Sequence, residues 1–175
     1  IRFSGSGGQG MILAGIIMAE AAGIYGDKNA AQSQSYGPES RGGASKAEVI
    51  ISDQMIDYPK ATSIDCMLAL TQEACTKYHH DIKDGGTLLV DSSLVKEVPA
   101  GNFKVVSFPI IDTAREELGK VIVANIISLG MITELTGVVT HEQIEKAVLS
   151  RVPPAFLDLN KKALQIGFEK ARELK

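Results

Sequence analysis

This 175-residue sequence has few aromatic side chains and no excess of positive charge. It has no tryptophan, and aromatic residues make up only 5% of the chain. Its 18 Lys and Arg residues are outnumbered by 21 Asp and Glu, which gives a net charge of −3. Nucleic-acid-binding domains usually present a basic surface, often with aromatic side chains on which bases stack. The composition therefore argues against a nucleic-acid partner.

Cysteine is also scarce, and its two copies, Cys66 and Cys75, have neither metal-ligand spacing nor the pattern of a disulfide framework. We interpret both as small apolar residues of a core. The adjacent His79 and His80 cannot share one face of a helix, so we interpret them as cations near a helix C-terminus. The sequence thus predicts no metal site in this chain, and it favours a reducing, cytoplasmic setting.

Long uninterrupted apolar runs are missing as well. Residues 11–25 are too few to cross a bilayer and include Glu20. Residues 121–139 are numerous enough, but Asn125 and Glu134 interrupt them. We therefore expect no membrane span and interpret both segments as buried helices. Each could be covered by its own chain or by another subunit.

Glycine, in contrast, is concentrated near the start of the chain. Four glycines occur within six residues, Gly5-Ser6-Gly7-Gly8-Gln9-Gly10. Glycines allow a tight strand-to-helix turn with uncovered backbone N–H groups, and a helix that begins there directs its positive end at the turn. The expected ligand is an anion, such as a phosphate, a carboxylate or a partner's acidic side chain. The alternative is a turn used only for close packing between helix and sheet.

The glycine spacing also fits the G-x-G-x-x-G pattern of dinucleotide-binding folds. Such a site needs a carboxylate at the end of the second strand, about 20 residues further on, to hold the ribose hydroxyls. Gln32, Ser33 and Gln34 stand there instead, Asp27 comes too early, and Glu39 belongs to the next loop. The sequence therefore argues against ordinary dinucleotide binding.

A second loop carries groups that suit a ligand or a partner. Its sequence is Gln34-Ser35-Tyr36-Gly37-Pro38-Glu39-Ser40-Arg41-Gly42-Gly43. Tyr36 offers a hydroxyl and a flat face, and Arg41 offers a planar fork suited to carboxylate or phosphate. Gly42 and Gly43 would let another backbone approach closely. The alternative is a surface loop in which Glu39 and Arg41 merely pair with each other.

Strand and helix patterns alternate along the chain, which predicts an α/β fold. We predict strands at residues 1–4, 28–34, 44–52, 63–70, 87–90 and 103–108. We predict helices at residues 10–26, 72–83, 112–118, 121–136, 142–150 and 154–174. The expected architecture is a single domain, residues 1–175, with a Rossmann-like layered fold: a largely parallel sheet flanked by helices and a helical C-terminal third. In such a sheet the two glycine-bearing loops emerge at the same edge.

The glycine turn and the segment 34–45, taken together, resemble the gamma subunits of 2-oxoacid:ferredoxin oxidoreductases. The Ala19-Glu20-Ala21-Ala22 stretch between them and the segment 48–52 fit the same pattern. Within that family, the second motif looks more like the 2-oxoglutarate branch than the pyruvate branch. The pyruvate type usually has Gly-Ala-Glu-Arg-Arg-Gly at this place.

The resemblance implies a role in the CoA-dependent oxidative decarboxylation of a 2-oxoacid to acyl-CoA and CO2, with electrons passed to ferredoxin. In this family thiamine diphosphate and Mg²⁺ lie between the alpha and beta subunits, and iron–sulfur clusters lie in the beta subunit or a ferredoxin-like delta subunit. The chain would then hold no firmly bound cofactor and no catalytic residue, and would be inactive alone.

The residues expected at a subunit junction, or near coenzyme A, are Gly5, Gly7, Gly8, Gln9, Gly10, Tyr36, Gly37, Glu39, Arg41, Gly42 and Gly43. The same family acting on pyruvate, branched-chain 2-oxoacids or indolepyruvate remains an alternative, as does a stand-alone nucleotide-binding protein.

Overall fold

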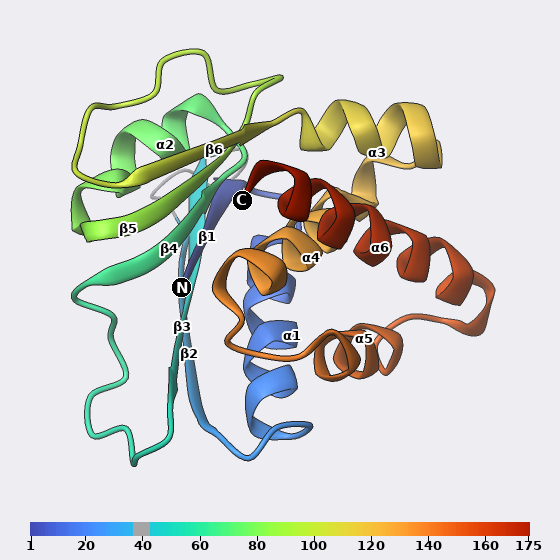
Figure 1. Ribbon diagram of the computed structural model, residues 1–175, viewed down its shortest axis with the longest axis horizontal. Helices are drawn as coiled ribbons and strands as arrows, with labels where there is room; N and C mark the ends of the chain where they lie inside the picture. The colour runs from blue at the N-terminus through green and yellow to red at the C-terminus, as the bar shows by residue number, and fades with distance from the viewer. Residues whose placement is uncertain (37–42) are drawn as a thin grey trace.

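The computed structural model describes residues 1–36 and 43–175, and within these ranges the strands form one six-stranded sheet (Figure 1). The strand order is β2-β3-β1-β4-β5-β6. In chain order the strands are β1 (Arg2–Ser6), β2 (Asn29–Tyr36), β3 (Ala44–Ser52), β4 (Ile64–Ala69), β5 (Ile82–Asp91) and β6 (Lys104–Phe108). β3 pairs antiparallel with β1 and β2, whereas the remaining neighbours pair parallel, so β3 alone runs against the others. The prediction of a largely parallel sheet is confirmed.

The ends of β1 and β2 lie at the same edge of this sheet. Gly5 of β1 and Tyr36 of β2 both pair with Ser45 of β3. The turn after β1 and the end of β2 therefore lie side by side, as expected if the two glycine-bearing loops share an edge. Because β3 separates β1 from β2, the strand order differs from that of dinucleotide-binding folds, in which the second strand lies next to the first.

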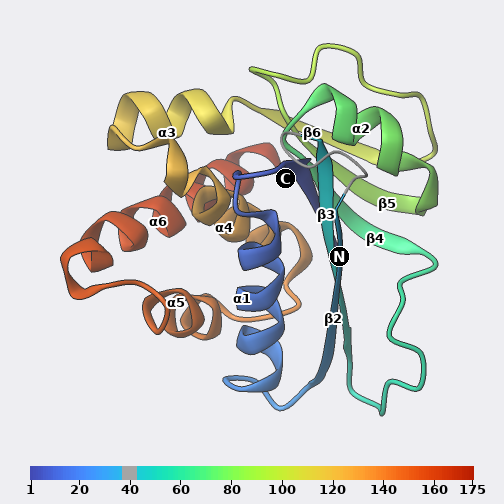
Figure 2. The same ribbon diagram turned by 180° about the vertical axis from the view of Figure 1, so that it is seen from behind.

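Helices cover both faces of the sheet (Figures 1 and 2). The α-helices are α1 (Met11–Gly23), α2 (Gln72–Tyr78), α3 (Ile110–Leu118), α4 (Ala124–Thr136), α5 (His141–Leu149) and α6 (Leu157–Leu174). Short 3-10 helices are η1 (His79–Asp81), η2 (Val121–Val123) and η3 (Pro154–Phe156). α2 lies on one face, where Cys75 packs with Met67 and Leu88 in a small core. The other helices lie on the opposite side of the sheet, and α6 runs along α4.

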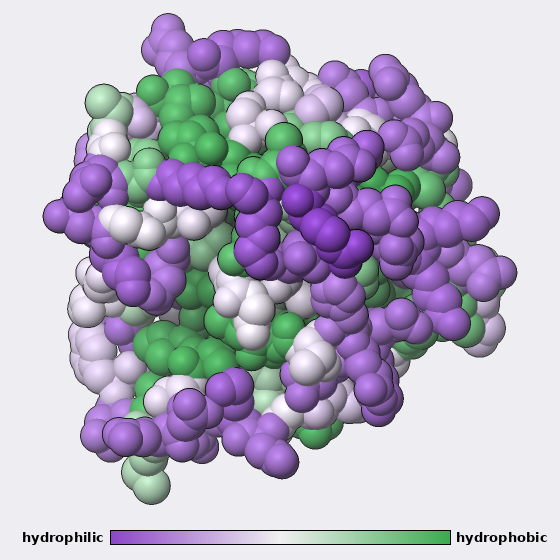
Figure 3. All heavy atoms as spheres, viewed as in Figure 1, coloured by the Kyte–Doolittle hydropathy of each residue, from purple (hydrophilic) through white to green (hydrophobic). Residues whose placement is uncertain are grey.

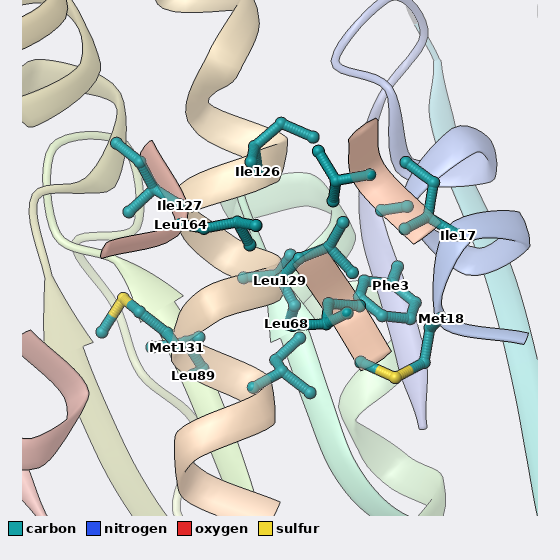
Figure 4. Packing of buried hydrophobic residues seen from close by; sticks show 14 of the residues in the cluster. Phe3, Ile17, Met18, Leu68, Leu89, Ile126, Ile127, Leu129, Met131 and Leu164 are labelled. Carbon is teal, nitrogen blue, oxygen red and sulfur yellow. The ribbon is translucent and has the colours of Figure 1, made fainter. Parts of the chain in front are cut away.

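The larger core lies between the sheet and the helices α1, α4 and α6 (Figure 4). Phe3 of β1 and Leu68 of β4 meet Met18 of α1 and Leu129 of α4 there. The first ten residues of α4 are all buried, which explains why that helix is apolar nearly all round. Its cover comes from this chain itself. The outer face of α6, in contrast, carries hydrophilic side chains (Figure 3).

Several element boundaries differ from the sequence-based prediction. The helix predicted over residues 72–83 ends at Tyr78, and η1 and the start of β5 occupy the rest. Gly85 and Gly86 therefore lie inside a long strand, where the Gly85 N–H donates to the Asn102 carbonyl at 2.7 Å. β2 continues to Tyr36, so the start of the predicted loop is strand. Within the described ranges, no helix has the length and apolar character needed to cross a membrane.

Candidate functional site

The turn between β1 and α1 is held in shape by one of its own side chains. The Gln9 side-chain oxygen accepts a hydrogen bond from the Ser6 N–H at 2.8 Å, and the Gln9 N–H donates to the Ser6 carbonyl at 3.2 Å. Gly8 and Gly10 have φ angles of 88° and 77°, in the left-handed region where other residues are strained. These two glycines are needed for the backbone shape of the turn.

Gly5 has a different role, which is close packing. A Cβ atom at this position would collide with the Gln9 side-chain oxygen and would stand 3.3 Å from the Met11 Cγ and 3.4 Å from the Leu70 Cβ. The expectation that the turn serves helix–sheet packing therefore holds for Gly5. It does not account for Gly7 and Gly8, which are exposed.

The second glycine-rich segment touches the turn directly. The Gly7 N–H donates to the Gly43 carbonyl at 3.2 Å, so the turn and the end of the β2–β3 connection are joined. Tyr36, at the end of β2, is 66% exposed on the same edge of the sheet. Four of the predicted site residues lie outside the described residues: Gly37, Glu39, Arg41 and Gly42. The structure thus brings together the remaining seven.

Part of the turn stays open to an anion. The N–H groups of Ser6 and Gly7 are already used, but within the described part of the chain no acceptor bonds to the N–H groups of Gly8 or Gly10. α1 begins at Met11 with no acidic residue in its first turn, so its positive end is not neutralised there. The geometry fits a negatively charged group at the exposed side of the turn.

Asn125 of α4 is a neighbour of the turn that the sequence reasoning missed. Its amide nitrogen lies 3.5 Å from the Gly10 carbonyl, and a Cβ atom on Gly10 would come within 2.5 Å of that nitrogen. Next to it, a pocket of about 130 Å³ is lined by Gly8, Gln9, Leu70, Ile111, Val121, Ile122 and Ala124. The only signal in the sequence was a polar residue within an apolar run.

Titratable groups near this edge have structural partners. Asp91 is fully buried at the end of β5, and its carboxylate accepts from the N–H groups of Ser93 at 2.7 Å and Ile111 at 2.7 Å. Its oxygens therefore tie β5 to the start of α3. Away from this edge, near the N-terminal end of β4, burial raises the pKa of the Cys66 thiol to about 12, which makes it unreactive at neutral pH. Residues 1–36 and 43–175 contain no cluster of three or more potential metal ligands.

Known proteins of one family are similar to this chain over nearly its whole length. Residues 1–170 match the family described as pyruvate ferredoxin/flavodoxin oxidoreductase. The 2-oxoglutarate synthase subunit KorC from Methanocaldococcus jannaschii is 49% identical over 99% of this chain and 94% of its own length.

Two solved structures match as well. The keto/oxoacid ferredoxin oxidoreductase gamma subunit from Geobacter sulfurreducens has a TM-score of 0.93 and 63% identity, covering 99% of this chain and 96% of that one. The pyruvate oxidoreductase subunit PORC from Thermotoga maritima has a TM-score of 0.79 and 28% identity, covering 96% and 93%. The resemblance to gamma subunits is confirmed, and the chain belongs to the pyruvate ferredoxin/flavodoxin oxidoreductase family.

Proposed function

We propose that this chain is the gamma subunit of a 2-oxoglutarate:ferredoxin oxidoreductase and that residues 1–175 act in it as one domain. The observation that carries the proposal is the higher identity to a 2-oxoglutarate synthase subunit, 49%, than to a pyruvate oxidoreductase subunit, 28%. The motif at residues 34–43, which looks like the 2-oxoglutarate branch, supports the same choice. The complex would convert 2-oxoglutarate and coenzyme A to succinyl-CoA and CO2 and would reduce ferredoxin.

The chain's own chemistry fits an accessory role in that complex. Cys66 and Cys75 are both buried, in different cores, so they do not form the cysteine set that an iron–sulfur cluster needs. Thiamine diphosphate, Mg²⁺ and the clusters would accordingly be held by alpha, beta and ferredoxin-like delta subunits, in the cytoplasm. This chain would complete the assembly.

The edge that carries the glycine turn, Tyr36 and Gly43 is the surface that we assign to the catalytic subunits. Exposed Gly7, Gly8 and Tyr36 let a partner approach the backbone there, and the start of α1 favours a negative group. Coenzyme A carries phosphates and would suit the same place. In this proposal Arg41 supplies the second contact to a carboxylate or phosphate of the partner or of coenzyme A.

The test is anaerobic purification of the tagged chain from its native cells, followed by identification of the proteins that accompany it. We expect a thiamine-binding subunit and an iron–sulfur subunit, and viologen reduction that depends on coenzyme A and 2-oxoglutarate. Faster reduction with pyruvate, a branched-chain 2-oxoacid or indolepyruvate would move the proposal to that substrate. Recovery of the chain alone, under conditions that keep other complexes whole, would contradict the subunit role.

A further inference from the structure

An apolar groove lies beside the glycine turn, on the side of α1 that faces away from the sheet. It is lined by residues of α1, of η2 and the start of α4, and of η3 and the start of α6. Its volume is about 320 Å³, within the size range of pockets that hold small molecules. Of the seven predicted site residues that the structure describes, only Gly10 lines it.

The walls of the groove leave large apolar side chains in contact with water. Leu13 of α1, Ile122 of η2 and Phe156 of η3 are all exposed, with Ile122 at 64%. Ile17 and Ile126 form a buried floor below them. Apolar side chains that gather around one concavity, rather than scatter singly, are typical of a binding site.

Two buried amides supply polar groups at the base of this groove. Asn125 is 4% exposed and Asn160 is 5% exposed, and both line it. Their nitrogens donate within the protein, from Asn160 to the Phe156 carbonyl at 2.9 Å and from Asn125 to the Gly10 carbonyl at 3.5 Å.

The oxygens of these two amides remain available. Within the described residues, no donor reaches the Oδ1 atom of Asn125 or of Asn160, and neither oxygen is among the unpaired polar atoms that are sealed from solvent. Because both side chains are otherwise buried, their remaining access is through the groove. The two Oδ1 atoms are therefore hydrogen-bond acceptors that a ligand in this apolar groove could satisfy with its own donors.

Positive charge stands at the rim. Arg151 is held by the Glu20 carboxylate through two nitrogens, so its charge is compensated. Lys120 lines the groove and forms no ion pair with a residue of the described ranges. One uncompensated cation beside an apolar groove favours a ligand with a negative end.

We propose that this groove binds a small amphiphilic anion: a flexible alkyl or acyl body with an N–H or O–H donor along it and a carboxylate or phosphate at one end. The apolar body lies against Leu13, Ile122 and Phe156, the donor meets the oxygens of Asn125 and Asn160, and the anionic end lies at Lys120. This assignment does not depend on the proposed subunit role. The competing occupant is an apolar segment of another subunit, which the test distinguishes.

The probe is N-octanoylglycine, titrated calorimetrically into the purified chain. Octanoate lacks its amide donor and N-octylacetamide lacks its carboxylate, so these two compounds separate the contributions. We expect saturable one-to-one binding of N-octanoylglycine and affinities lower by about tenfold for each comparison compound, since 1.4 kcal/mol corresponds to a factor of ten. Absence of saturable binding would overturn the proposal.

Two variants locate the site. Ile122→Asp places a negative charge in the groove and should lower the affinity for N-octanoylglycine by about tenfold or more. The matched control is Val105→Asp on β6, where the replaced side chain is 41% exposed and does not line the groove. Equal effects of the two substitutions would refute the assignment.

The charge contact is tested by Lys120→Ala. This substitution should lower the affinity for N-octanoylglycine severalfold and leave the affinity for N-octylacetamide unchanged, because only the first compound carries a carboxylate. The same titration on the assembled complex identifies the competing occupant. Binding to the isolated chain that disappears in the complex would show that a partner segment covers the groove, and would exclude the small-molecule site.

Discussion

Gly130 of α4 and Gly167 of α6 meet where the two helices cross, with no side chain between the backbones. A Cβ atom on Gly167 would lie 2.9 Å from the Gly130 Cα, and one on Gly130 would lie 3.1 Å from the Gly167 Cα. The collision also involves the carbonyl oxygens of Ile127 and Leu164. Contacts below 3.0 Å are essentially never made by real Cβ atoms, and each glycine would have at least one of them. The close packing of α6 against α4 therefore requires that both positions lack a methyl group.

Gly167→Ala should therefore destabilise the chain although alanine favours helices. Overpacking of this kind costs about 1–3 kcal/mol in the free energy of unfolding. The control is Gly23→Ala at the end of α1, where a Cβ would find ordinary contacts at 3.7 Å. Helix propensity alone should make that variant neutral or more stable by up to about 1 kcal/mol. Urea denaturation measures the free energy of unfolding of both variants. If Gly167→Ala were stabilised as much as Gly23→Ala, α6 would have to be able to move away from α4.

Gly10→Ala should cost more stability than Gly8→Ala. Both substitutions strain a left-handed backbone, at about 1–2 kcal/mol each, but the Cβ on Gly8 meets open space while the one on Gly10 meets Asn125. The difference between the two variants therefore measures the contact. Combining Gly10→Ala with Asn125→Ala should recover that difference in a double-mutant cycle. If no recovery is seen, the two residues are not coupled.

Local signals in the sequence were sufficient for the elements of the fold. The predicted helix over residues 142–150 begins with a capping box that the sequence itself spells out: the Gln143 N–H donates to the Thr140 hydroxyl, and the Thr140 N–H donates to the Gln143 side chain. The strand over residues 44–52 has the predicted bounds. The shared edge of the two glycine segments followed from the alternation of strands and helices, which predicts parallel strands whose carboxyl ends lie at one edge of the sheet.

Relationships between distant segments could not be predicted in the same way. Periodicity identifies β3 as a strand but does not say that it lies antiparallel between β1 and β2. The reason for glycine at position 130 lies in α6, and the reason for asparagine at position 125 lies partly in the Gly10 turn. A single sequence does not reveal such pairs, because each partner looks ordinary in its own segment.

Glu48→Gln should destabilise the chain by about 3 kcal/mol, because it leaves the buried Arg2 guanidinium with less compensation. Arg2 is 1% exposed and donates to Glu48 through Nε at 2.9 Å and Nη2 at 2.6 Å, while half-exposed Asp81 remains as a second partner. Asp53→Asn is the control, since it breaks an exposed pair with Lys28 and should cost less than about 1 kcal/mol. Chemical denaturation at pH 7 compares the two.

The same pair predicts a pH dependence. Burial by itself raises the pKa of Glu48, but hydrogen bonds from Lys46 and Arg2 outweigh it and hold the pKa below the ordinary value. A carboxylate with a lowered folded-state pKa contributes its stability above the unfolded-state pKa and loses it as the pH falls through the folded one. The difference between wild type and Glu48→Gln should thus shrink below about pH 4. A difference that is constant with pH would contradict this account.

Neither cysteine should react with a thiol reagent at pH 8 while the chain is folded. Burial raises the pKa of both thiols, to about 12 for Cys66, so almost no thiolate is present to attack. A time course with an aromatic disulfide reagent should show no release of colour in buffer and two equivalents in urea. Rapid reaction of the native chain would mean that one of the two cores opens.

Arg41→Ala should weaken assembly with the other subunits, or raise the coenzyme A concentration needed for activity, without lowering the stability of the isolated chain. Arg41 belongs to the motif at residues 34–43, and Gly7, Gly8 and Tyr36 form an exposed edge at the start of that segment. A guanidinium there can bind a carboxylate or phosphate through two nitrogens. Lys28→Ala is the matched control, because it removes one positive charge at the opposite end of β2. If both variants assemble and turn over like the wild type, Arg41 is not an anion contact at the junction, and the glycine turn alone would have to supply it.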